Sequence, residues 1–79
     1  MRLSAHAREA MLVRAIEFAW IVDTLEHPES NTPDPRDPPL KRSFRSIEQA
    51  SGRVLRVVHR AQGEDIVVVT VFFDRGAKP

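Results

Sequence analysis

The sequence predicts an α+β domain in which two N-terminal helices pack on a three- to four-stranded antiparallel sheet. Two runs, 53–60 and 65–74, are dense in β-branched and aromatic side chains, and the short segment between them contains Gly63. This pattern is typical of a β-hairpin. Ahead of residue 28, apolar side chains recur at spacings of three and four, as on the buried face of a helix. The 79 residues make a single domain, 1–79, so the helices and the hairpin must share one core.

Two helices are expected at the beginning of the chain. Ser4 is a suitable N-cap, because its hydroxyl can accept a hydrogen bond from a free amide of the first turn, and the helix formers after it predict a helix over residues 5–14. A second helix is expected over residues 17–27, and Pro28 ends it. Trp20 in this helix is either half-buried core or part of an exposed recognition surface, and the sequence leaves both open.

Three strands are expected after the helices, with a fourth at the N-terminus. Residues 40–48 alternate in a pattern that indicates a first long strand before the hairpin. Both faces of the 65–74 run are apolar, so we expect it to be a central strand and not an edge, with the charged 53–60 run nearer to solvent. Residues 1–3 are expected to form a very short strand that pairs with the 65–74 run.

The segment between the second helix and the first long strand, residues 28–39, is predicted to be a proline-rich loop. It holds five of the six prolines and no aliphatic or aromatic side chain. Proline fixes φ and removes a donor, so an extended, mobile and partly polyproline-like segment is expected. Because loop-closure entropy changes slowly with length, residues 29–39 are expected to be dispensable for folding.

Composition excludes several classes of function. The chain has no cysteine, which removes disulfides, thiolate zinc sites and cysteine nucleophiles. Its three histidines lack the short spacing of metal ligands, and neither a glycine-rich phosphate loop nor a G-x-S-x-G motif is present, so no metal and no cofactor are expected. No apolar run approaches the ~20 residues that cross a bilayer, and no export signal opens the sequence. We therefore expect a cytoplasmic protein without a membrane partner.

Charge is divided unevenly along the chain, although the formal net charge is only +1. Residues 17–37 carry six acids against one base, and residues 41–60 carry six bases against one acid. The folded domain should therefore have an acidic and a basic side. The basic side is either a solvated surface or a binding surface for a polyanion such as RNA, and both interpretations stay open.

The segments SAHAREAMLVRAI, LEHPE, GRVLRVVHR and IVVVTVFF resemble the prokaryotic Domain of Unknown Function family 4258. Two positions depart from the pattern of that family, since Ala10 stands where a second arginine is common and Ala15 where glycine is expected. The family is similar in fold to RelE-, ParE- and BrnT-like toxins. The resemblance implies a ribonuclease (mRNA interferase) of a toxin–antitoxin pair. It also implies RNA or the ribosome, an antitoxin protein and a second copy of the chain as partners.

Histidine and arginine side chains are the candidates for RNA cleavage. Attack by the 2′-hydroxyl requires a base, an acid and cations that stabilise the charged phosphorane. His6, in the first turn of the first helix, and the arginines Arg14 and Arg56 are the candidate catalytic residues of a metal-independent endoribonuclease. Each has a structural alternative: His6 can bond the neighbouring backbone, Arg14 can bond helix-end carbonyls, and Arg56 can keep an exposed strand soluble.

Further basic side chains on the first helix and the strands are the candidates for RNA binding: Arg8, Arg42, Arg53, His59 and Arg60. Arg56 and Arg60 share one face of the 53–60 strand, and Arg53 and His59 share the other, so either pair is placed to hold a phosphate. The alternative function is a non-catalytic protein-interaction module on the same fold. The absence of tyrosine favours it, because RelE-like nucleases often use a tyrosine near the scissile phosphate.

Overall fold

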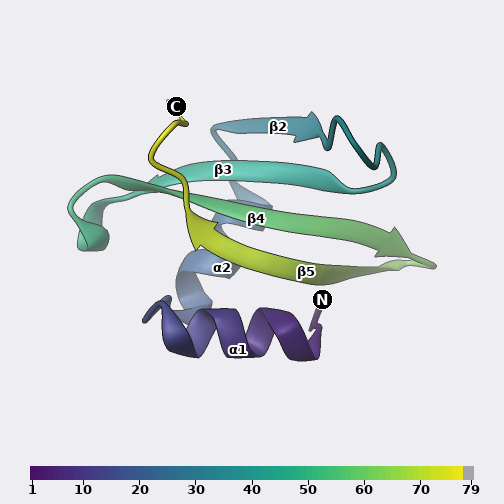
Figure 1. The fold of residues 1–79 in the computed structure, drawn as a ribbon, viewed down its shortest axis with the longest axis horizontal. Coiled ribbons are helices and arrows are strands. Elements are labelled where there is room, and N and C mark those ends of the chain that lie inside the picture. The colour runs from purple at the N-terminus through teal and green to yellow at the C-terminus, as the bar shows by residue number, and fades with distance from the viewer. Residues whose placement is uncertain (78–79) are drawn as a thin grey trace.

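The structure is a computed structural model that describes residues 1–77, and it contains two helices and a five-stranded sheet (Figure 1). In chain order the elements are β1 (Arg2–Leu3), α1 (Ala5–Val13), α2 (Phe18–Glu26), β2 (Ser30–Pro33), β3 (Lys41–Ile47), a 3₁₀ turn (Glu48–Ala50), β4 (Arg53–Gln62) and β5 (Asp65–Phe73). Both helices lie on one side of the sheet and contribute to one core. The bounds of the two helices agree with the predicted ranges to within one residue.

The predicted three- to four-stranded antiparallel sheet is wrong, because the sheet has five strands and is mixed. Its strand order is β1-β5-β4-β3-β2, with β1 parallel to β5 and every other pair antiparallel. The expected pairing of the N-terminal strand with the 65–74 run is confirmed, with Arg2 opposite Val67 and Leu3 opposite Val68. The fifth strand is β2, which sequence patterning missed because it has no apolar side chain.

The proline-rich segment 28–39 is therefore not a loop throughout. Ser30–Pro33 pairs with β3, and Pro33 is tolerated there because β2 is an edge strand with one unpaired side. The chain then turns at Asp34, whose carboxylate accepts hydrogen bonds from the backbone N–H groups of Arg36 (2.9 Å) and Asp37 (3.1 Å). Removing residues 29–39 would strip an edge strand from the sheet, so the expectation that they are dispensable loses its basis.

The 65–74 run is a central strand and not an edge, as predicted, but the 53–60 run does not lie nearer to solvent, because β4 is the middle strand of the sheet. The hairpin itself is confirmed, and β5 is an interior strand because β1 covers its outer side at one end. However, β4 pairs with a neighbour on each side over most of its length, and it contains several buried residues: Val54, Leu55, Val57, Val58 and His59. The arginines of this strand led to the expectation that it lies near solvent. Arg53 and Arg60 lie toward its two ends, and Arg56 binds a carboxylate, as described below.

A β-bulge interrupts the hairpin next to the start of α1. Val58 pairs with Thr70 and His59 pairs with Val68, so Val69 has no partner on β4. The carbonyl of Val69 instead accepts a hydrogen bond from the Ser4 hydroxyl at 3.0 Å. The same hydroxyl caps α1, as predicted, by accepting from the N–H of Ala7 at 3.0 Å. One side chain therefore joins the helix start to the irregular point of the sheet.

The break between the helices lies at Ala15, which adopts φ +52°. The N–H of Ile16 bonds the carbonyl of Met11 at 2.9 Å, and the N–H of Ala15 bonds that of Leu12 at 3.3 Å. These two bonds form a Schellman motif, which usually places glycine at the left-handed position. Alanine there carries a steric cost of about 1 kcal/mol, and the turn still forms because Ile16 is buried in the core.

The core lies between the two helices and one sheet face. Ala7 and Ala10 are buried in α1 and face β5, and their small size lets the helix approach the sheet closely. The main members of the cluster from the other elements are Ile16, Ile21, Ile47, Leu55, Val57, Val68 and Val71. Trp20 is half-buried against this cluster with its ring centroid 6.3 Å from that of Phe73, which confirms the half-buried alternative. Neither helix within residues 1–77 has the length and apolar character to span a membrane.

Candidate anion-binding site

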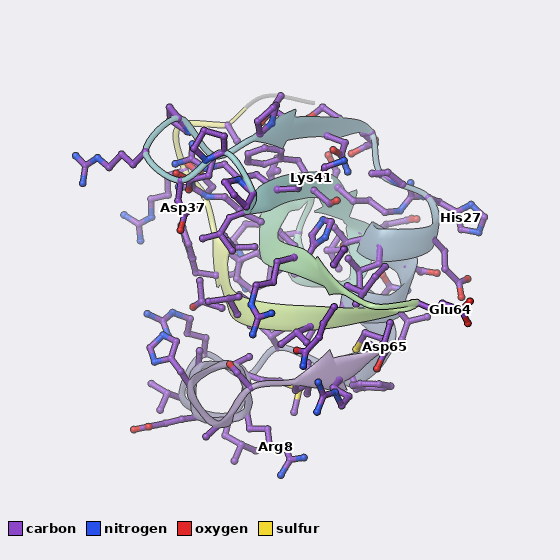
Figure 2. All side chains as sticks on the ribbon, turned by 90° about the vertical axis from the view of Figure 1, so that its right-hand side faces the viewer. Arg8, His27, Asp37, Lys41, Glu64 and Asp65 are labelled. Carbon is purple, nitrogen blue, oxygen red and sulfur yellow. The ribbon has the colours of Figure 1, made fainter. Side chains whose placement is uncertain are left out.

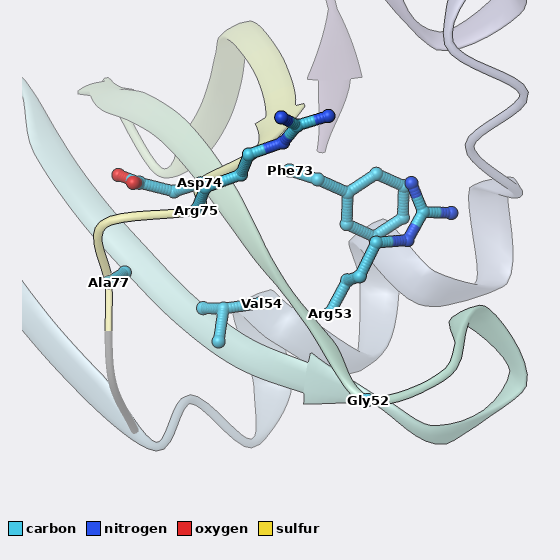
Figure 3. A pocket seen from close by; sticks show the side chains of 7 residues that line it. All are labelled: Gly52, Arg53, Val54, Phe73, Asp74, Arg75 and Ala77. Carbon is cyan, nitrogen blue, oxygen red and sulfur yellow. The ribbon is translucent and has the colours of Figure 1, made fainter.

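Two adjoining pockets open where β4 begins, β5 ends and α1 finishes. The first, of about 280 Å³, is lined by residues from the start of β4 and from the end of β5 onward: Gly52, Arg53, Val54, Phe73, Asp74, Arg75 and Ala77 (Figure 3). The second, of about 460 Å³, shares Arg53, Phe73 and Arg75 with it and adds Arg14 and Phe72. We refer to Arg14, Arg53 and Arg75 as the arginine cluster.

Arg53 is held in place by its surroundings. It follows a tight turn in which Ser51 and Gly52 have φ +61° and +75°, and the N–H of Gly52 bonds the carbonyl of Ile47. The Nε of Arg53 donates to the carbonyl of Ala50 at 3.1 Å, and its guanidinium carbon lies 4.0 Å from the centroid of the Phe73 ring. Figure 3 shows this guanidinium beside the ring. The cation–π contact and the backbone bond together restrict the orientation of this guanidinium, and the residue stays exposed.

The arginine cluster has no carboxylate partner among residues 1–77. The ion pairs formed by arginines in this range involve Arg2, Arg42 and Arg56. Asp74 lines the first pocket, but its carboxylate binds Arg56 at 2.9 Å. Arg14, Arg53 and Arg75 are all exposed, so their positive charges add at one surface and favour an anion there.

Arg56, a candidate catalytic residue, lies outside the arginine cluster. Its guanidinium carbon is 4.4 Å from the centroid of the Phe72 ring and 5.8 Å from that of Phe44, and its Nη2 binds Asp74. The side chain is only 17% exposed, and its buried Nε has no hydrogen-bond partner among the described residues. The structure thus places Arg56 in a stacked, neutralised position.

The structure does not bring His6 and Arg14 together. His6 is exposed in the first turn of α1, and Arg14 is the C-cap of the same helix. Eight residues of α-helix separate them by roughly 12 Å along the axis. The catalytic roles of His6, Arg14 and Arg56 stay predictions, and only Arg14 lies in the cluster.

The residues predicted to bind RNA are distributed over several surfaces. Arg53 belongs to the arginine cluster. Arg8 and Arg60 line a separate polar pocket near the N-terminus, and Figure 2 shows Arg8 pointing outward from α1. Arg42 contacts the Asp34 carboxylate through Nε and Nη2, both at 3.2 Å. The Asp34 pKa lies below its ordinary value, chiefly because the backbone N–H of Arg36 donates to the carboxylate.

His59 lies in the interior, where its Nε2 is 2.8 Å from Ser43 Oγ. Ser43 is also buried and accepts a hydrogen bond from Asn31 Nδ2 at 2.9 Å. Burial, with a smaller contribution from the charge of Lys41, lowers the pKa of His59 and favours neutral imidazole. Within residues 1–77, no three His, Asp or Glu side chains are grouped to hold a metal ion.

Sequence analysis did not single out Arg75, which follows the predicted 65–74 strand. The backbone N–H of Gly76 donates to the Asp74 carboxylate at 2.9 Å, which forms a turn. An Asp-x-Gly sequence after a strand is a common turn pattern. Reading Asp74–Gly76 in this way would have indicated an ordered Arg75 close to the strand end.

These observations define a small α+β domain with a mixed five-stranded sheet and an exposed arginine cluster at one end of its central hairpin. The model of the family described as "Domain of unknown function (DUF4258)" matches residues 3–73, and the chain belongs to this family. No match was found among curated proteins or among solved structures. The likeness to RelE- and BrnT-like toxins therefore stays a prediction.

Proposed function

We propose that this domain binds RNA by holding backbone phosphates at the arginine cluster. The observation that carries the proposal is that Arg14, Arg53 and Arg75 line two adjoining pockets without a carboxylate partner among the described residues. Guanidinium groups match phosphate oxygens through paired N–H bonds. The half-buried Phe72 ring lines the second pocket and is of the kind that stacks on unpaired bases, which favours single-stranded RNA.

The ribonuclease function expected of a toxin is proposed as an extension of this binding. The guanidinium groups would stabilise the negative charge of a phosphorane, and His6 remains the candidate base. Since His6 and the arginine cluster lie near opposite ends of α1, the RNA would have to run along this helix for both to act on it.

The test is a titration of a fluorescently labelled single-stranded RNA with the protein at several salt concentrations. Arg53→Gln and Arg75→Gln should each weaken binding and reduce the salt slope by about one. Arg36→Gln is the matched control, because Arg36 is exposed on the far turn of the 34–40 segment and lines neither pocket. Equal affinities for all variants would contradict the proposal. Cleavage of the RNA by wild type but not by His6→Ala would support the ribonuclease extension.

A second candidate, the non-catalytic interaction module, is favoured by two side chains next to the cluster. Leu12 and Val13 are 76% and 73% exposed immediately before Arg14. Exposed aliphatic groups beside unpaired arginines suit an acidic protein segment with apolar side chains. Competition between RNA and a synthetic acidic peptide separates the two: if only the peptide binds and Leu12→Ser abolishes its binding, the interaction module is the function.

A further inference from the structure

An apolar groove lies between α2 and the N-terminal side of the sheet, away from the arginine cluster. It has a volume of about 450 Å³ and is lined by residues of α2, the chain start and β5: Met1, Phe18, Val22, Leu25, Glu26 and Ile66. Phe18, Val22 and Leu25 follow the spacing i, i+4, i+7, so they form one stripe along α2. A different stripe, with Ile21 and Thr24, is buried against the sheet. The helix therefore has a second apolar stripe that the fold covers only in part, since Val22 and Leu25 are half-buried and Phe18 is exposed.

Three apolar side chains of this groove are exposed. Phe18 is 50% exposed, Met1 42% and Ile66 37%. Single exposed apolar residues are common, but several lining one groove mark an interaction surface. The arrangement of a helical stripe beside a strand residue fits the way in which a second helix lays its apolar side chains into a groove.

The surroundings of the groove are acidic. Exposed Glu17, Asp23 and Glu26 lie on or next to α2, which has no basic residue. Glu64 and Asp65 precede Ile66, and Figure 2 shows both on the side of the molecule where His27 follows α2. The Met1 amino group and Arg2 balance the charge of Asp65, at 2.6 Å and 3.6 Å from its carboxylate, so the excess negative charge comes from the glutamates and Asp23. A second copy of the chain that docked through this same groove would bring acids against acids, which opposes a symmetric dimer.

We propose that the groove binds an amphipathic helix of a partner protein that has aliphatic side chains on one face and lysine or arginine flanking them. The apolar stripe and the acidic surroundings both select this occupant. The proposal is independent of RNA binding, because the groove and the arginine cluster have no lining residue in common.

The test uses the full chain and two synthetic helical peptides that share a leucine stripe, one with lysines and one with glutamates at all other positions. The lysine peptide should shift the methyl NMR signals of Val22, Leu25 and Ile66 and bind at least tenfold more tightly than the glutamate peptide. Phe18→Ser should weaken this binding about tenfold, because it removes a large apolar contact. Ala19→Ser is the matched control, since Ala19 is exposed on the same helix and does not line the groove.

Several outcomes would overturn the proposal. Equal binding of the two peptides would mean that charge does not select the occupant, and an equal loss of affinity in Ala19→Ser would mean non-specific adhesion. Concentration-dependent shifts of the same methyl groups without peptide would make a second copy the occupant. If circular dichroism shows that Phe18→Ser unfolds the chain, Ile66→Thr takes its place, because Ile66 is exposed on a strand where threonine is tolerated.

Discussion

The same strands supply the side chains of both faces of the sheet, but the two faces are stabilised by different interactions. On the face below the helices, Leu55, Val57 and Val71 are fully buried and belong to the apolar core cluster. On the opposite face, which has no helix, Arg42 and Arg56 are held by Asp34 and Asp74. The comparison teaches that a charged residue on a strand is not necessarily available to a ligand.

Arg53 and Arg56 show this most directly, because they are only three residues apart on β4. Both have a guanidinium group over a phenylalanine ring, at 4.0 Å from Phe73 and 4.4 Å from Phe72. Arg56 is also paired with Asp74 and is 17% exposed, whereas Arg53 is exposed at the strand start. Position along the strand and the presence of a carboxylate decide which of the two can bind an anion.

The largest expected effect comes from shortening a buried side chain on the sheet face that the helices cover. Leu55→Ala should lower the free energy of unfolding by about 3 kcal/mol, because a fully buried leucine leaves a cavity in the centre of the sheet. Val69→Ala, at the bulge, should cost clearly less, since Val69 is only partly buried. Urea unfolding followed by circular dichroism measures both, and equal losses would mean that the bulge residue belongs to the core.

The next effect tests the helix-free face. Asp74→Ala should lower stability by about 2 kcal/mol, because it leaves the largely buried Arg56 charge without a partner. Arg56→Met should cost less than about 1 kcal/mol, since an apolar side chain of similar length can pack between the phenylalanine rings. Thermal unfolding of the two variants compares their losses of stability. If Arg56→Met is the more destabilising variant, the ion pair itself stabilises this face.

A smaller effect concerns the polar residue within the core. The pKa of His59 is lowered by burial, so the unfolded chain binds a proton at higher pH than the folded chain does. Stability should therefore be fully present above the ordinary pKa of about 6.5 and fall as the pH decreases below it. Urea unfolding between about pH 5 and 8 should show this slope in wild type and in His6→Ala. In His59→Asn the free energy of unfolding should depend less steeply on pH. An unchanged pH dependence in this variant would mean that another titratable group causes it.

Local patterns predicted much of this structure, while features that depend on register were not accessible. The helix ranges, the hairpin and the pairing of residues 1–3 followed from spacing and turn residues. The middle position of β4 and the neutralised state of Arg56 depend on which strand lies beside which. The strand Ser30–Pro33 is held by backbone bonds to β3 and by Asn31, so no apolar pattern marks it.

The candidate site was predicted in part for the same reason. Arg14 and Arg53 were singled out from their charge, and the structure brings them together. Arg75 was missed because the turn at Asp74 went unrecognised, and Arg56 was grouped with Arg53 because alternation along one strand does not reveal a carboxylate on the next element. Neutralisation by a residue distant in sequence is a tertiary property.

The smallest expected effect concerns the turn at Ala15, which connects the two helices. Ala15→Gly should raise the free energy of unfolding by about 0.5 to 1 kcal/mol, because glycine adopts φ +52° without the steric cost that alanine carries. In a domain of this size the melting temperature should rise by about 2 to 8 °C. Differential scanning calorimetry measures the shift.

The matched control is the same change at Ala19, which is exposed and lies in the right-handed conformation of α2. Ala19→Gly should lower stability by about 0.5 kcal/mol, because glycine loses more conformational freedom in a helix. Opposite signs of the change in unfolding free energy at the two positions would show that the backbone conformation at Ala15 destabilises the turn between the helices. They would exclude a general effect of replacing alanine. A loss at both positions would mean that the gain in unfolded-chain entropy outweighs the relief of strain.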